Sequence, residues 1–176
     1  HTKDQRFDIH QPAFRPEWLS ADDKHILARL HAAISACTEN LERCRFNDYA
    51  KTMYEFLWHQ YCDWYVEYSK PILYSEDIER RTEVLKVMHY VFAQALKLLQ
   101  PLMPFLTEEL WHGMGYCAEG ETILTAAWPV SMEMDELREW GVTQKAVSYV
   151  EAKHELIRIG RTLRSDYGIP PSQKVD

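Results

Sequence analysis

Apolar residues recur at alternating steps of three and four along several stretches of the chain, which is the spacing of one face of an α-helix. The first stretch begins after Ser20, and the pair Ser20 and Asp23 is typical of a helical capping box. Its apolar positions are Leu27, Leu30, Ile34, Cys37, Leu41 and Cys44. The pattern predicts an amphipathic helix over residues 20–44.

The second stretch, residues 46–69, is apolar on two sides. One side carries Ala50, Met53, Leu57, Tyr61, Trp64 and Tyr68, and the other carries Tyr54, Trp58 and Tyr65. A helix that is apolar on two faces is expected near the centre of a fold. The third stretch, residues 78–100, has the same character, and we expect it to be well buried too.

Proline marks the end of the third helix. Pro101 and Pro104 interrupt it, and Pro104 is well placed to open a short fourth helix over residues 105–114. Residues 115–130 have no helical period, so they are predicted to form a loop with a brief extended piece near residues 122–124.

The last part of the chain is again helical in pattern. We expect a short helical turn at residues 132–140 and a long helix over residues 142–166, with Val150, Leu156, Ile157 and Leu163 as its apolar positions. Gly168 and the following Pro170-Pro171 would end it. The fold class that follows is all-α, an up-and-down bundle of about five helices.

The domain division predicted from this pattern has three parts. Residues 1–19 form an N-terminal connecting segment, residues 20–167 form the bundle, and residues 168–176 form an exit segment. The chain starts at His1 without an initiator Met or a signal peptide, so we expect it to be a piece of a longer protein.

Composition narrows the possible partners. The net charge of -7 argues against a non-specific nucleic-acid binder, DNA included, so any contact with RNA must come from a local basic patch. No apolar run approaches the roughly 20 residues that cross a bilayer, so no membrane partner is expected.

The four cysteines form no CxxC pair, which favours reduced thiols and a cytoplasmic location. Cys37, Cys44 and Cys62 fall inside predicted helices, where cysteine behaves as a small buried apolar residue. Cys117 falls in the predicted loop.

Motifs for catalysis are missing from the sequence. There is no nucleophile elbow and no phosphate-binding glycine loop. Glu151 and His154 have the ExxH spacing of di-iron bundles, but such a site needs a second ExxH and two further glutamates, and no second one occurs. We expect no catalytic residue and no metal site.

Two basic groups are candidates for binding RNA. The first surrounds the junction of the first two helices and consists of Arg43, Arg45, Phe46, Asn47 and Lys51. Unpaired bases stack on aromatic rings and guanidinium planes, although spacing alone favours the alternative, in which Phe46 is a core residue and the arginines solvate a helix end. The second group follows Lys153 on the last helix and consists of Arg158, Arg161 and Arg164. A solvated helix face is the alternative there.

Four sequence strings carry a family resemblance. Arg45-Phe-Asn-Asp-Tyr-Ala50 and Trp58-His-Gln-Tyr-Cys-Asp-Trp-Tyr-Val-Glu67 resemble the anticodon-binding domain of valyl-tRNA synthetases. Leu98-Leu-Gln-Pro-Leu-Met-Pro-Phe-Leu-Thr-Glu-Glu-Leu-Trp111 is similar to a hairpin shared with the isoleucyl and leucyl enzymes, and the segment from Ile157 to Lys174 is similar to the valyl type. His25-Ile-Leu-Ala-Arg-Leu30 departs from the family pattern, which often opens this helix with Trp.

The resemblance implies a function without local chemistry. The intact enzyme would activate valine with ATP and Mg²⁺ and attach it to valine tRNA, while this bundle holds the anticodon arm, carries no cofactor and is inactive alone. Its partners would be valine tRNA and the catalytic and editing domains of the same polypeptide. The equivalent domain of an isoleucyl or leucyl enzyme is one alternative, and a helical protein-interaction module is another.

Overall fold

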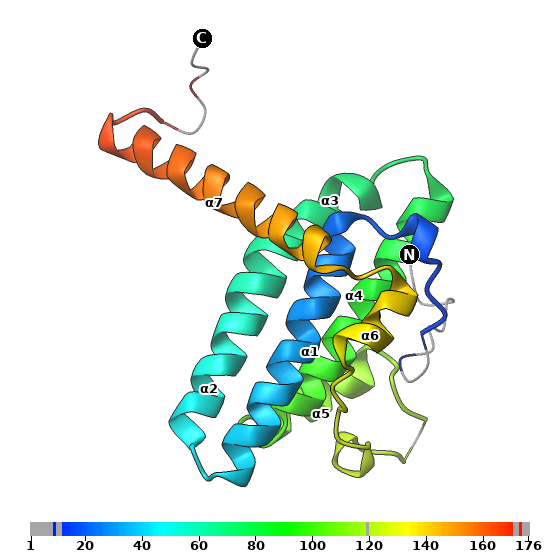
Figure 1. Cartoon of the computed structure of the whole chain (residues 1–176). Coiled ribbons are helices and arrows are strands. Elements are labelled where there is room, and N and C mark those ends of the chain that lie inside the picture. Colours follow the sequence, from blue (N-terminus) through cyan, green and yellow to red (C-terminus); the bar gives the residue numbers. More distant parts are fainter. Residues whose placement is uncertain (1–8, 10–11, 119, 171–172, 174–176) are drawn as a thin grey trace.

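In a computed structural model, which describes residues 9, 12–118, 120–170 and 173, three long helical segments follow one another, each antiparallel to the one before it (Figure 1). Helix α1 spans Ala21–Glu42, and α4 spans Ile78–Leu99. Between them one continuous rod consists of α2 (Phe46–Tyr54), the π-helix η2 (Glu55–Val66) and α3 (Glu67–Leu73). Helix α1 packs against α2, η2, α4 and the last helix, which makes it the centre of the fold.

Shorter elements cover the side of α4 and α1. Helix α5 (Pro104–Gly113) packs on α4, and the 3-10 turn η3 (Ile123–Thr125) packs on α5. Next come α6 (Met134–Leu137), the 3-10 turn η4 (Arg138–Trp140) and α7 (Gln144–Asp166). A further 3-10 turn, η1 (Pro16–Trp18), precedes α1. The all-α bundle predicted from the sequence is confirmed.

The predicted start of α1 is confirmed. The Ser20 side chain accepts a hydrogen bond from the Asp23 amide, and the Asp23 carboxylate accepts one from the Ser20 amide. Asp23 is fully buried, where it also accepts a hydrogen bond from the Tyr65 hydroxyl at 2.7 Å and pairs with Arg80. A buried carboxylate needs such partners, so this cluster ties α1, η2 and α4 together.

The second helical rod departs from the predicted pattern. Neither of its two apolar sides is buried throughout: Tyr54 and Trp58 are 57% and 55% exposed, whereas Tyr65 of the same side is buried. The buried positions are Tyr49, Met53, Phe56, Tyr61, Tyr65 and Ser69, with a step of five between Phe56 and Tyr61. A π-helix has wider turns than an α-helix, so η2 rotates the chain and moves Tyr61 and Tyr65 into the core in place of residues 60 and 64.

The end of α1 also corrects a prediction. Cys44 was expected to be a buried helical residue, but it lies just beyond α1, is exposed and has φ of 54°. Its amide donates to the Leu41 carbonyl and the Arg45 amide donates to the Asn40 carbonyl, which is the Schellman arrangement. The left-handed residue turns the chain sharply, so that α2 can start at once.

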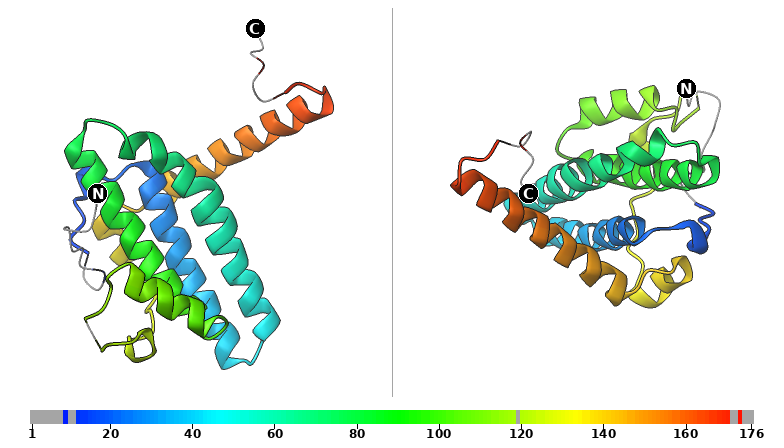
Figure 2. Two further views of the ribbon diagram at one scale, coloured as in Figure 1. Left: turned by 180° about the vertical axis from the view of Figure 1, so that it is seen from behind. Right: turned by 90° about the horizontal axis from the view of Figure 1, so that it is seen from above.

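Helix α7 does not join the antiparallel set but crosses one end of it (Figure 2). Its first turns pack on α1 through Val147 and Val150, which are its two buried residues. The remainder projects from the bundle, and Leu156 and Leu163 are 70% and 51% exposed. The helix is present as predicted, but most of its apolar face is uncovered.

The segment after α5 is a loop, as predicted, but the prediction of a brief extended piece near residues 122–124 is wrong. Residues 123–125 form η3, a 3-10 turn, because the Thr122 hydroxyl accepts a hydrogen bond from the Leu124 amide and starts a tight turn. Most of the expected connecting and exit segments, residues 1–8, 10–11, 171–172 and 174–176, lies outside the described residues. Among the described helices, none is long and apolar enough to cross a membrane.

Candidate RNA-binding site

The turn between α1 and α2 and the turn between α4 and α5 lie at the same end of the bundle, here called the distal end (Figure 1). Buried Tyr49, near the start of α2, donates a hydrogen bond from its hydroxyl to the Leu98 carbonyl near the end of α4. This contact fixes the two turns relative to each other.

Apolar side chains are unusually exposed at the distal end. Phe46, the first residue of α2, is 60% exposed, and Phe105, the second residue of α5, is 91% exposed. Three further exposed apolar residues surround Phe105 in the sequence, namely Leu102, Met103 and Leu106. The core alternative for Phe46 is therefore wrong, and its ring is available to a ligand.

The two arginines beside Phe46 share one carboxylate. Arg43 and Arg45 each place a guanidinium nitrogen 3.0 and 3.1 Å, respectively, from the same Glu39 oxygen. Arg45 also lies 4.0 Å from Asp48. All of these groups are exposed, so the pairs are weak and an incoming phosphate could compete with Glu39 for both arginines.

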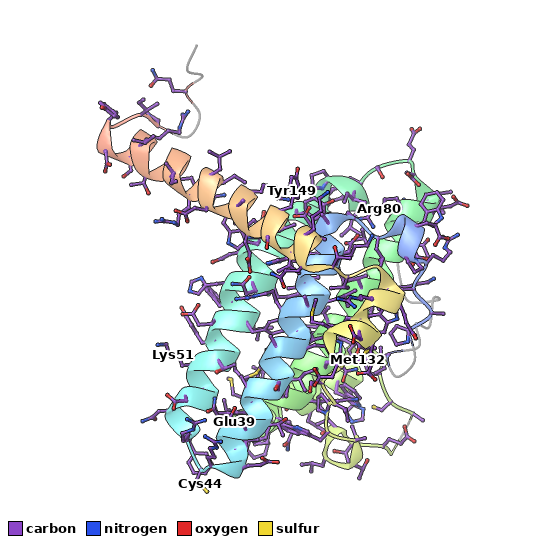
Figure 3. All side chains as sticks on the ribbon, in the orientation of Figure 1. Glu39, Cys44, Lys51, Arg80, Met132 and Tyr149 are labelled. Atoms are coloured by element: carbon purple, nitrogen blue, oxygen red, sulfur yellow. The ribbon has the colours of Figure 1, made fainter. Side chains whose placement is uncertain are left out.

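Asn47 and Lys51 continue the site along α2. Both are exposed, and their spacing of four places them on one side of the helix. Lys51 follows Asn47 by one helical turn and so lies farther from the distal end. Figure 3 labels Lys51 on α2 together with Cys44 and Glu39 nearer that end. It also lines a cleft of about 360 Å³ between α1 and the α2–η2 rod, together with Arg29 and Glu55.

Sequence reasoning missed an exposed aromatic pair on the same rod. The rings of Tyr54 and Trp58 are stacked, with centroids 6.3 Å apart and planes within 11°. Asn47, Lys51, Tyr54 and Trp58 follow steps of four, three and four, so they fall on one helical stripe. That spacing was visible in the sequence, but the two rings were assigned to the core.

The second predicted group lies at the opposite end of the bundle, on α7, so the structure does not bring the two groups together (Figure 1). Its three arginines have partners within the chain. Arg158 forms two hydrogen bonds with Glu155, at 2.8 and 2.6 Å, and Arg161 lies over the Trp64 ring at 5.3 Å. Arg164 donates to the carbonyl of Pro170.

The ExxH pair has other contacts. Glu151 pairs with Arg29 at 3.5 Å, while the His154 ring stacks on Trp64 with centroids 3.9 Å apart. Within the described ranges, no three His, Cys, Asp or Glu side chains are arranged to hold a metal ion. Burial lowers the pKa of His154, and burial together with His154 lowers the pKa of His25 opposite it to about 4.

Comparison with known proteins identifies the family of this chain. The family model described as the anticodon-binding domain of tRNA ligase matches residues 23–176. This chain therefore belongs to the family of anticodon-binding domains of tRNA ligases. The match covers every helix from α2 to α7 and nearly all of α1, so both basic groups lie within the domain.

The chain is similar to curated valine–tRNA ligases from several bacteria. The one from Latilactobacillus sakei is 37% identical over 172 residues, covering 96% of this chain, and the one from Aquifex aeolicus is 38% identical, covering 89%. A third, from Clostridium tetani, is 38% identical and covers 86% of the chain. The chain spans only 18%, 14% and 16% of these ligases, so it corresponds to one domain of each.

Proposed function

We propose that the distal end of this anticodon-binding domain holds the anticodon loop of valine tRNA. The exposed Phe46 ring carries the proposal, because it would stack on an unpaired base. Asn47 and Arg45 would contact base edges, and Arg43 and Lys51 would hold phosphates. The choice of valine tRNA is supported by the names of the three ligases that the chain resembles.

Binding by this site would involve an exchange of ion pairs. Arg43 and Arg45 pair with the single Glu39 carboxylate in the absence of RNA, so phosphates would take over both guanidinium groups when RNA arrives. Each phosphate contact releases a counterion and makes the affinity fall with salt. This local exchange is how an acidic domain, of net charge -7, would still bind a polyanion.

The exposed pair of Tyr54 and Trp58 would extend the same surface. Their rings lie on the stripe that begins with Asn47 and Lys51, so a nucleotide next to the anticodon could stack there. Arg158, Arg161 and Arg164 would contact a different part of the tRNA, because α7 lies at the other end of the bundle. Each would first have to give up a partner within the chain, so we expect them to contribute less.

The test is a titration of the chain with valine tRNA and with the same tRNA carrying another anticodon. Base stacking is typically worth about 1–3 kcal/mol, so Phe46→Ala should weaken binding by roughly 5- to 150-fold. Tyr74→Ala is the matched control, since Tyr74 is 88% exposed and follows α3 near the other end of the rod. Equal loss in both variants, or no loss in either, would reject the site.

A second variant tests the ion-pair exchange. Glu39→Gln removes the carboxylate that pairs with the two arginines and should tighten tRNA binding several-fold at low salt, with a smaller gain at high salt. Unchanged affinity would mean that Arg43 and Arg45 do not contact phosphate. Because this variant leaves the Phe46 ring in place, it measures the contribution of the two arginines to binding separately from that of the ring.

For the whole polypeptide we propose valine–tRNA ligase activity, with ATP and Mg²⁺ bound in a catalytic domain outside this chain, and a cytoplasmic location. The domain limits at residues 20 and 167 and the absence of catalytic residues between them are part of this proposal. A preference for the tRNA that carries an isoleucine or leucine anticodon in this titration would favour those ligases. Binding that ignores RNA would favour a protein-interaction module.

The exposed face of α7 fits a further part of this proposal. Leu156, Ile159, Leu163 and Tyr167 are all exposed and follow steps of three, four and four. The similar ligases are more than five times as long as this chain, so the other domains of the same polypeptide are the proposed partner for this face.

A further inference from the structure

Three side chains near the end of α5 form a chain of contacts that the RNA-binding proposal does not use. The Cys117 sulfur lies 3.3 Å from His112 Nδ1, and His112 Nε2 lies 2.9 Å from a Glu108 carboxylate oxygen. A nucleophile, a base and a group that orients the base in this order are the arrangement that activates nucleophiles in many enzymes.

Local structure explains why the three groups meet. Glu108 and His112 are four residues apart on α5, so they share one face of the helix. The helix ends in a left-handed residue, Gly115, and the Tyr116 amide bonds back to the Trp111 carbonyl at 3.1 Å. This turn folds the chain back and places Cys117 over the last turn of α5.

Neighbouring contacts hold the cluster in place. The second Glu108 oxygen accepts hydrogen bonds from the Thr122 hydroxyl at 2.7 Å and from the Ile123 amide at 3.2 Å. The Tyr116 hydroxyl lies 3.0 Å from His89 Nδ1 on α4, which anchors the residue next to Cys117. These contacts hold Glu108 on one side of the His112 imidazole and the segment that carries Cys117 on the other side.

The hydrogen bonds also set which nitrogen is basic. The bond from Thr122 is the main cause that lowers the pKa of Glu108, so this carboxylate is charged and accepts the proton on His112 Nε2. In the neutral imidazole the other nitrogen, Nδ1, is then the acceptor, and it faces the thiol.

The thiol itself is protonated at rest. Burial, with the Glu108 and Glu121 carboxylates, raises the pKa of Cys117. A thiolate-only reaction would therefore be slow at neutral pH, and reactivity requires that the base remove the proton during attack. The geometry provides this base, and the site is accessible, since Cys117 is partly exposed and the His112 side chain is 45% exposed.

We propose that Cys117, with His112 as its base and Glu108 as the positioning residue, is a thiol-modification site that exchanges with small organic disulfides. The Cys117 sulfur attacks one sulfur of the disulfide while its proton passes to His112 Nδ1. The disulfide bond breaks, a mixed disulfide forms on Cys117, and the departing thiolate takes the proton from His112. The disulfide is the oxidant, and His112 returns to its neutral form.

The experiment follows each cysteine of the chain separately during reaction with glutathione disulfide, using mass spectrometry of peptides. Exposed Cys44 is the internal reference. At pH 7 we expect Cys117 to react about tenfold faster than Cys44. The His112→Asn variant should lose at least about tenfold at Cys117 with no change at Cys44, and Glu108→Gln should lie between the two.

The pH profile distinguishes a base from a structural role. With His112 as the base, the Cys117 rate should rise less steeply with pH than in His112→Asn, where it should rise about tenfold per pH unit, as for a simple thiolate. A Cys117 rate no faster than that of Cys44, or a rate and slope unchanged in His112→Asn, would overturn the proposal. Neither result depends on tRNA binding.

Discussion

Helices α1 and α7 are almost identical in length, 22 and 23 residues, and each begins with a capping hydroxyl, yet they are buried very differently. Helix α1 buries ten residues, whereas α7 buries only Val147 and Val150. Both have apolar residues at helical spacing. An amphipathic pattern therefore predicts that one face of a helix packs against something. It does not show that this packing partner lies within the same domain.

The difference comes from position in the fold. Helix α1 is surrounded by α2, η2, α4 and α7, so nearly every side of it meets another helix. Helix α7 buries side chains only in its first turns and then projects away from the bundle, with His154 and Arg161 touching Trp64 along the way (Figure 2). Its apolar residues beyond position 155 meet nothing among the described residues that buries them.

The largest expected difference is in the effect of removing a leucine side chain. Leu30 of α1 is fully buried, so Leu30→Ala should lower the free energy of unfolding by about 2–5 kcal/mol. Leu163 of α7 is 51% exposed, so Leu163→Ala should change it by less than about 0.5 kcal/mol. Urea denaturation of both variants measures this, and a similar loss in each would mean that α7 is covered in solution.

Acid should weaken the contact between the two helices. The His25 ring on α1 meets the His154 ring on α7 edge to face, with centroids 5.4 Å apart. Burial and His154 lower the pKa of His25 to about 4, below its ordinary value of 6.5, so the unfolded chain binds protons more readily. Stability should therefore be full above pH 7 and fall as the pH drops from 6.5 towards 4.

The measurement is the melting temperature between pH 8 and 5.5, above the range where ordinary carboxylates titrate. His25→Gln removes the imidazole and should flatten this dependence. Some dependence should remain, because burial also lowers the pKa of His31 to about 4. A wild-type melting temperature that is constant over this range would contradict the burial of both rings.

The smallest expected effect concerns the C-terminal ends of α1 and α7, which have the same hydrogen-bond pattern. At the end of α7 the left-handed residue is Gly168, with φ of 63°, whereas at the end of α1 it is Cys44. A side chain in this conformation costs about 1 kcal/mol. Cys44→Gly should therefore raise the free energy of unfolding by about 0.5–1 kcal/mol, while Cys44→Ala, which keeps the strain, should not.

Gly168→Ala is the counterpart on α7. It introduces the same strain, but at the projecting end of the helix, so we expect faster amide hydrogen exchange near residue 168 and an unchanged global unfolding free energy. A global loss similar to the gain in Cys44→Gly would show that the end of α7 folds cooperatively with the bundle.

The candidate site was partly accessible to sequence reasoning. The string around Arg45 and Phe46 located it, because a short specific motif does not depend on packing. The exposure of Phe46 and the pairing of both arginines with Glu39 did not follow from it, since both depend on how the turn after α1 is closed. The contact between Cys117 and His112 is of the same kind, because a left-handed residue at position 115 creates it.

The sequence alone determined the helices, the capping box at Ser20, the proline break before α5 and the family, because helical periodicity, end signals and motif strings are local properties of a chain. Only the tertiary structure decided which apolar faces are covered. The widened turns of η2 brought Tyr61 and Tyr65 into the core, and the crossing of α7 left Leu163 outside. Burial depends on the relative orientation of whole helices, and a pattern that repeats along one helix does not contain that orientation.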